Sequence, residues 1–159
     1  MPVSRDIAAT YRGPRKVVQR LLDMGQREDR ALIFVMAACV ITFIAQWPYL
    51  ARRAHLEDVE LNGLLAGSLM AWIIVAPLLL YVLAWFSHVL ARLVGGKGSY
   101  YSARIALFWA FLATSPLMLL HGLMRGFIGM GTQEQIIGLV WLGCFLWFWL
   151  AGLWQAERA

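Results

Sequence analysis

The sequence predicts an all-α integral membrane protein, a bundle of four transmembrane helices preceded by an amphipathic interfacial helix. The chain has 159 residues, of which 61% are hydrophobic and only 14% are charged, and the apolar residues fall in four long runs. This composition is far from that of a soluble domain, in which about 25% of residues are charged. The basic residues lie mostly in short segments that flank the runs, which is the pattern of membrane topology.

Residues 1–30 are expected to form a cytoplasmic, basic and amphipathic arm. Apolar side chains recur there at helical spacing beside a basic face. Gly13 and Pro14 interrupt the pattern, so we expect two short helices or one kinked helix, with Pro14 as the first residue of the second piece. The arm is expected to lie on the cytoplasmic leaflet, with Tyr11 and Val18 entering the apolar layer. The expected membrane-surface contacts are Arg12, Arg15, Lys16 and Arg20. A solvated, charged tail is the alternative.

Residues 31–159 are expected to form the transmembrane bundle. The predicted spans cover about residues 31–50, 64–90, 103–124 and 136–154. Each is long enough to cross a hydrocarbon layer of about 30 Å at a rise of about 1.5 Å per residue. Pro48, together with the Arg52-Arg53 pair, is expected to close the first span.

A tight basic turn is expected between the second and third spans. Gly95, Gly96 and Gly98 lie there between two apolar runs, and glycine adopts left-handed backbone conformations without steric cost. Ser99 and Ser102 are both plausible N-caps for the helix that follows. The rest of the bundle is expected to be arranged around this hairpin.

Small residues recur at four-residue spacing on the two spans that the turn joins. Gly67 and Ala71 form one stripe, and Ala106 and Ala110 form the other. Such stripes allow helices to approach closely, so we expect the two to face each other and to make this helix pair the most tightly packed one. The alternative is a chance spacing without a contact.

Two prolines near the middle of the same spans are hinge candidates. Pro77 and Pro116 each remove a backbone hydrogen bond and bend their helix, and in lipid the freed carbonyl must find a partner inside the bundle. The simpler interpretation is that they shape the bundle. The alternative is a crevice for a small apolar ligand, or a gate.

A resemblance to a known family rests on the same region. The stretch GGKGSYYSARIALFWA, followed by Pro116, resembles the bacterial branch of the Yip1 domain family. That family usually has five spans, whereas four are expected here. The resemblance implies a small multipass protein of the bacterial inner membrane that organises membranes or binds other membrane proteins, and it implies no catalytic residue.

The residues point to no reaction, metal or cofactor. Apart from Arg104 at the start of the third span, the four predicted spans contain no Asp, Glu, Lys or Arg, and the chain has neither an HExxH motif nor a phosphate-binding loop. His88 and His121 are expected to lie about 25 Å apart in depth, too far to share an ion. Cys39 and Cys144 are expected to behave as small hydrophobes. We therefore expect a protein that is not an enzyme and that has no cofactor and no nucleic-acid partner. Its expected partners are the lipid bilayer and either other membrane proteins or a second copy of the chain.

The distribution of basic residues predicts the orientation. Of the 14 Lys and Arg residues, 11 fall in the arm, the flanks of the glycine turn and the C-terminal tail. Both termini and the glycine turn are therefore expected in the cytoplasm.

The alternative function is a small permease or channel that uses the Pro77/Pro116 pair. Its path would require one cavity to collect the polar residues Thr42, Gln46, Ser68, Ser87, Thr114 and Ser115.

Overall fold

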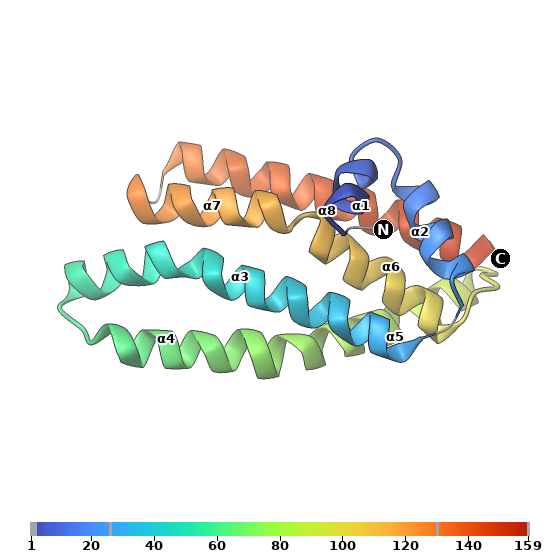
Figure 1. The fold of residues 1–159 in the computed structure, drawn as a ribbon, viewed down its shortest axis with the longest axis horizontal. Coiled ribbons are helices and arrows are strands. Elements are labelled where there is room, and N and C mark those ends of the chain that lie inside the picture. Colours follow the sequence, from blue (N-terminus) through green and yellow to red (C-terminus); the bar gives the residue numbers. More distant parts are fainter. Residues whose placement is uncertain (1–2, 26, 130, 159) are drawn as a thin grey trace.

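Most helices of the computed structural model run side by side along one long axis, and two short helices lie against one end of this bundle (Figure 1). The structure describes residues 3–25, 27–129 and 131–158, and every regular element in these ranges is helical. The short helices are α1 (Val3–Thr10) and α2 (Pro14–Asp23). The others are α3 (Glu28–Glu57), α4 (Leu61–Met70), the π-helical segment η1 (Ala71–Val75), α5 (Ala76–Leu93), α6 (Tyr100–Ala113), α7 (Ser115–Phe127) and α8 (Thr132–Arg158).

Three helices of the described chain are long and apolar enough to cross a membrane. They cover Glu28–Glu57, Leu61–Leu93 and Thr132–Glu157. A fourth span results if α6 and α7, which meet at an angle of 42°, are taken together as one broken span. The predicted all-α membrane bundle is therefore confirmed. The helices extend beyond the predicted spans, and the 30 residues of α3 correspond to about 45 Å.

Helix α3 does not end where we expected. The helix continues through Pro48 to Glu57 and ends at Asp58, which has a left-handed φ of 52°, so Pro48 does not end the helix, and the closing of the membrane span there stays a prediction. Helix α7 packs closely on this region, since a β-carbon built on Gly126 would overlap Pro48. A proline inside a membrane helix is tolerated when neighbouring helices cover the backbone that it frees.

The two mid-span prolines have different effects. Pro77 is the buried second residue of α5, which follows η1, and the Ala76 N–H donates to the Ala71 carbonyl. This wider turn makes room for the proline ring, so α4, η1 and α5 remain one span. The third predicted span, by contrast, is divided: Thr114 separates α6 from α7, and Pro116 lies exposed in the first turn of α7.

Helix α6 lies at the centre of the bundle. Every residue from Tyr101 to Ser115 is buried except Arg104, which is half-buried. Helices α3, α5 and α8 and the N-terminal helices α1 and α2 all contact α6. A helix that is apolar on all sides needs such complete cover from other helices or from lipid, and here the chain itself supplies it.

The packing partner of α6 is not the expected one. The prediction that Gly67 and Ala71 pack against Ala106 and Ala110 is wrong, because Gly67 and Ala71 are exposed and no atom lies within 4 Å of a β-carbon built on Gly67. Ala106 faces Gly152 of α8 instead, and a β-carbon on Gly152 would lie 3.4 Å from the Ala106 Cβ. Larger neighbours in α4 and η1 occupy the inner face because they bury more apolar area than glycine or alanine. Helix α6 also packs more extensively on α8 than on α5.

The N-terminal arm consists of two helices, and α2 begins at Pro14 as expected. Its apolar side packs on the bundle: Val17 and Val18 belong to the same buried cluster as residues of α6 and α8. The Tyr11 hydroxyl donates a 2.8 Å hydrogen bond to the Ala113 carbonyl. Burial raises the pKa of Tyr11 to about 12, so this donor stays protonated at neutral pH. The expectation that Tyr11 and Val18 enter the lipid is therefore wrong, because the chain's own helices cover that face.

A pair of glycine substitutions tests this packing. A β-carbon on Gly122 of α7 would overlap the Ala45 carbonyl of α3, whereas one on Gly67 meets no atom within 4 Å. We expect Gly122→Ala to lower the free energy of unfolding by about 1–3 kcal/mol. Gly67→Ala should leave it unchanged or raise it by up to about 1 kcal/mol, because alanine favours helix. Thermal unfolding in detergent measures both, and equal effects of the two variants would contradict the arrangement of α3, α4 and α7.

Candidate functional site at the glycine turn

The turn between α5 and α6 is closed by glycine backbone geometry. Gly95 has a φ of +99°, a left-handed conformation that glycine adopts without strain. The Gly96 N–H donates to the Ala91 carbonyl at 2.8 Å, and the Gly95 N–H donates to the Arg92 carbonyl at 3.1 Å. This Schellman motif satisfies the last carbonyls of α5 and reverses the chain within a few residues.

The same turn docks on the C-terminal end of α8. The Lys97 N–H donates to the Glu157 carbonyl at 2.8 Å, and the Gly98 N–H donates to Glu157 Oε2 at 3.0 Å. A β-carbon on Gly96 would lie 2.6 Å from Glu157 Oε2, and one on Gly98 would lie 2.5 Å from the Ala156 carbonyl oxygen. Gly96 and Gly98 are therefore needed for close approach, and Gly95 for its backbone angle.

A capping box starts α6 directly after the turn. Ser99 Oγ accepts a hydrogen bond from the Ser102 N–H at 3.2 Å, and Ser102 Oγ accepts one from the Ser99 N–H at 2.9 Å. Ser99 is thus the N-cap, and Ser102 is its reciprocal partner. The two serines fix the direction in which α6 leaves the turn.

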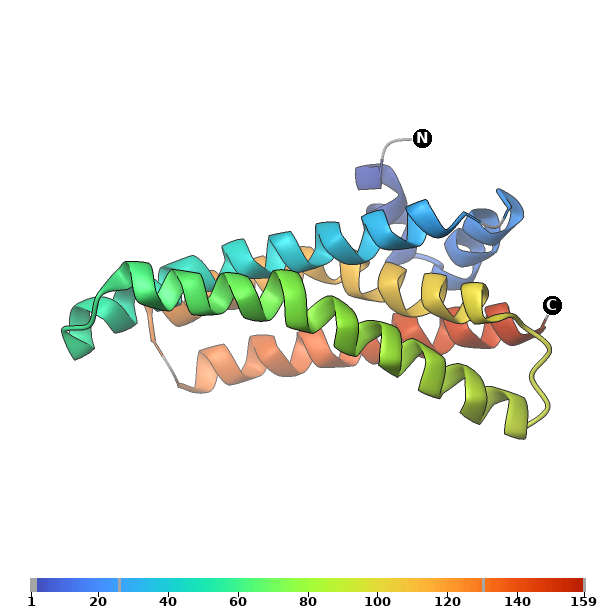
Figure 2. The same ribbon diagram turned by 90° about the horizontal axis from the view of Figure 1, so that it is seen from below.

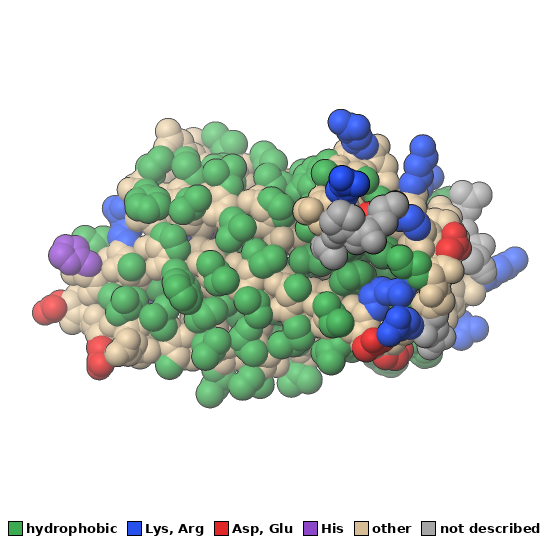
Figure 3. Space-filling view, viewed as in Figure 1, with side chains coloured by type: hydrophobic (Ala, Val, Ile, Leu, Met, Phe, Trp, Pro, Cys, Tyr) green, Lys and Arg blue, Asp and Glu red, His purple; other side chains and the backbone are tan. Residues whose placement is uncertain are grey.

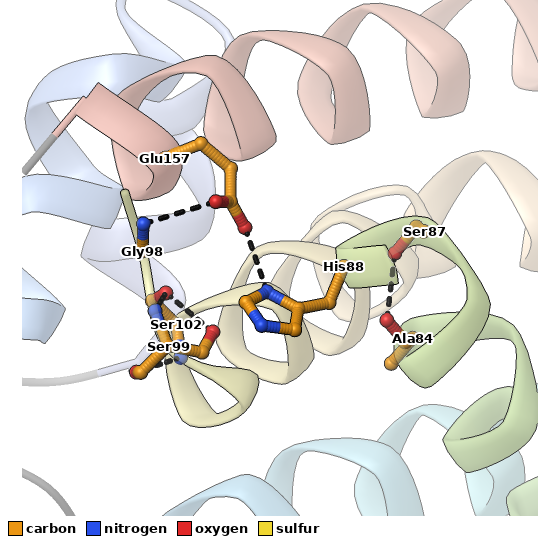
Figure 4. A network of polar contacts seen from close by, with 7 residues as sticks. All are labelled: Ala84, Ser87, His88, Gly98, Ser99, Ser102 and Glu157. Carbon is orange, nitrogen blue, oxygen red and sulfur yellow. Dashed lines mark hydrogen bonds and ion pairs between the residues drawn. The ribbon is translucent and has the colours of Figure 1, made fainter. Parts of the chain in front are cut away.

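A buried histidine–glutamate pair joins α5 to α8 beside the turn (Figure 4). His88 Nδ1 lies 3.0 Å from Glu157 Oε1, and the side chains of His88 and Glu157 are only 1% and 9% exposed. The His88 ring also packs against the Tyr100 ring at a tilt of 55°, with ring centroids 4.2 Å apart. A carboxylate near a helix C-terminus is disfavoured by the helix dipole. The contacts from His88 and the Gly98 N–H offset this cost.

A second pair of the same type lies near the other end of α8. His121 Nε2 of α7 is 2.8 Å from Oε1 of Glu134, which lies in the first turn of α8. A negative charge there is favoured by the helix dipole. The Arg125 guanidinium lies 4.0 Å from the same carboxylate and 3.8 Å from the centre of the Tyr49 ring. Near one end α8 is therefore linked to α5 through His88, and near its other end it is linked to α7 through His121.

The chemistry of these pairs is limited to hydrogen bonding and charge. Each holds one imidazole and one carboxylate, and among residues 3–25, 27–129 and 131–158 no group of three or more His, Cys, Asp or Glu residues could hold a metal ion. His88 and His121 pair with different glutamates near opposite ends of α8. The pairs act as ties between helices.

The predicted site residues lie in separate places. Gly96 and Gly98 meet α8 at the turn that Gly95 helps to form, Ala106 and Ala110 are buried in α6, and Gly67 and Ala71 are exposed. Pro77 and Pro116 lie in different helices and do not line the surface grooves at the glycine turn and around the N-terminal arm. Among the predicted surface cations, Arg12 and Lys16 are exposed, Arg15 lies 5.9 Å from the Trp154 ring, and Arg20 pairs with Asp6.

Sequence reasoning missed Glu134 and Glu157 because it placed both outside the last span. One signal could have found them. The predicted topology puts His88 and Glu157 at the cytoplasmic end and His121 and Glu134 at the other, so each histidine has a carboxylate at its own depth.

This fold and its sites define a multipass α-helical membrane protein built around one buried helix. The model of the Yip1 domain matches residues 9–158, and the chain therefore belongs to the Yip1 domain family, a family of non-enzymatic membrane proteins. No curated protein and no solved structure matches the chain.

Replacement of Glu157 tests the docked turn. Glu157→Ala leaves His88 Nδ1 and the Gly98 N–H without their acceptor, so it should lower the free energy of unfolding by about 1–3 kcal/mol. It should also speed tryptic cleavage after Lys97. Glu157→Gln keeps a side-chain hydrogen-bond acceptor, so its free energy of unfolding should fall by less than that of Glu157→Ala. Glu60, which is exposed at the start of α4, supplies the control Glu60→Ala. Equal cleavage after Lys97 in all three variants would contradict the docking.

Proposed function

We propose that this chain is a non-enzymatic Yip1-type protein that acts by packing. It organises the bilayer around it, or it binds other membrane proteins or a second copy of itself. The observation that supports this most is the uneven cover of its spans. Only 11% of the most apolar 18-residue stretch of Leu61–Leu93 is buried by the chain, compared with 44% for α3. Large exposed apolar faces indicate contact with a membrane or with a partner.

We place the protein in the bacterial inner membrane, with both termini and the glycine turn in the cytoplasm. The two termini and this turn lie toward the same end of the bundle (Figure 2). Of the 14 Lys and Arg residues, 11 fall in the segments at that end. The positive-inside rule favours the cytoplasmic side for such an end.

The alternative, a small permease or channel, loses support from the same structure. The hydroxyls of Thr42, Ser87 and Thr114 each donate to a carbonyl of their own helix. The Ser115 hydroxyl, in the first turn of α7, donates to the Leu112 carbonyl of α6. A hydroxyl bonded in this way satisfies its own helix backbone and offers little to a polar path. Neither these residues nor Gln46 and Ser68 line the grooves at the glycine turn and around the N-terminal arm.

Photo-crosslinking in native membranes tests the proposed partner contact. Leu79 on α5 and Ile33 on α3 are 62% and 61% exposed, so they form a matched pair. With a photoreactive residue in each place, we expect protein adducts, either to another protein or to a second copy, from position 79 and mainly lipid adducts from position 33. Lipid adducts alone at position 79 would contradict a protein partner on the α4–α5 face.

A further inference from the structure

A basic groove lies between the two helices of the N-terminal arm. One helix face supplies Arg5, Ala8, Ala9 and Arg12, and the facing side supplies Gly13, Lys16, Val17 and Arg20. These residues recur at steps of three or four, so each set forms one face of a helix and its adjoining turn. Four cations, called the rim cations below, and four small or apolar residues line the groove, which has a volume of about 630 Å³.

The bundle holds this groove in a fixed shape. Thr10 Oγ1 accepts a 2.9 Å hydrogen bond from Trp109 Nε1 of α6, and both side chains are buried. The neighbouring Tyr11 hydroxyl is bonded to the Ala113 carbonyl. Because these anchors lie just before the turn into α2, the two helices are positioned before any ligand arrives. Such preorganisation lowers the entropic cost of binding.

Three of the four rim cations have no acidic partner. Arg20 pairs with Asp6, whereas Arg5, Arg12 and Lys16 are exposed and form no ion pair within the described residues. Three unpaired cations around one hollow repel each other and attract an anion. Arginine suits phosphate in particular, because its planar guanidinium donates two parallel hydrogen bonds.

The position of the groove indicates the source of the anion. Hydrophobic side chains cover most of the length of the bundle in Figure 3, and Lys and Arg side chains gather over α1 and α2, at the edge of the apolar surface. A groove at that edge lies at the level of lipid headgroups. An acidic soluble protein would be expected to bind farther from the apolar surface.

We propose that the groove of Arg5, Arg12 and Lys16 binds the phosphate of an anionic phospholipid headgroup in the inner leaflet. The proposed site rests on the cytoplasmic orientation of the arm. It is a defined binding site, in addition to the general electrostatic attraction between the basic arm and an anionic membrane. Arg15 belongs to a different surface, over Trp154.

Lipid binding to the full-length protein in neutral detergent tests the site. Native mass spectrometry would measure the affinity for phosphatidylglycerol and for phosphatidylcholine. A triple variant, Arg5→Gln, Arg12→Gln and Lys16→Gln, should lower the phosphatidylglycerol affinity by about a hundredfold, since each nearby cation contributes about fivefold. Binding of phosphatidylcholine should stay unchanged. If the triple variant does not fold, the single variant Arg12→Gln can be measured instead, and its affinity for phosphatidylglycerol should be about fivefold lower.

A second triple variant with the same loss of charge is the control. Arg15→Gln, Arg92→Gln and Lys97→Gln remove three cations from segments at the same end but outside the groove. Equal losses in the two triple variants would overturn the site and leave only diffuse attraction. Full displacement of the lipid by millimolar inorganic phosphate would also overturn it, because the ligand would then be a soluble anion.

The orientation is measured independently, so its failure can be told apart. Reporter fusions after Gly98 and after Gln133 should give cytoplasmic and external signals respectively. The opposite pattern would overturn the proposed orientation, while groove-dependent binding in detergent would still support a phospholipid site.

Discussion

The complete burial of α6 is the constraint on which the rest of the structure depends. Ala103, Ala106 and Ala110 expose 0% of their surface, and the close contact of Ala106 with Gly152 brings α8 against the central helix. Helix–helix association in lipid relies on close van der Waals contact, which small residues permit. With α8, α3 and α5 around α6, the remaining open side is covered by the N-terminal arm, so the arm is part of the bundle core.

Polar contacts near the ends of the bundle complement this apolar centre. His88 with Glu157 near one end, and His121 with Glu134 near the other, tie α8 to α5 and to α7. Glu157 also receives the Gly98 N–H, so the glycine turn is fixed to the last turn of α8. Burying a polar group costs free energy unless it is hydrogen-bonded, and each of these carboxylates lies within hydrogen-bond distance of one histidine nitrogen.

Much of the fold could be predicted from the sequence because apolar length and turn chemistry are local signals. The four apolar runs, the start of α2 at Pro14 and the tight turn at Gly95 follow from such signals. Which helices pack against each other could not be predicted from such signals. The small residues around Gly67 permit the close approach of another helix, but their spacing does not determine which helix, if any, packs there. The apolar face around Val18 fits lipid and protein equally well, and only the three-dimensional arrangement decides between them. The glutamates of α8 were missed because ionisable residues were sought only inside the predicted spans.

A disulfide test addresses the central claim most directly. The Cβ of residue 152 would lie 3.4 Å from that of residue 106, near the separation of about 3.5–4.5 Å that disulfides require. In a protein lacking Cys39 and Cys144, the pair Ala106→Cys and Gly152→Cys should crosslink on mild oxidation in membranes, as mass spectrometry of the linked peptides would show. The pair Gly67→Cys and Ala106→Cys should not crosslink. The reverse result, a link from 67 to 106 and none from 106 to 152, would contradict a bundle built on the α6–α8 contact.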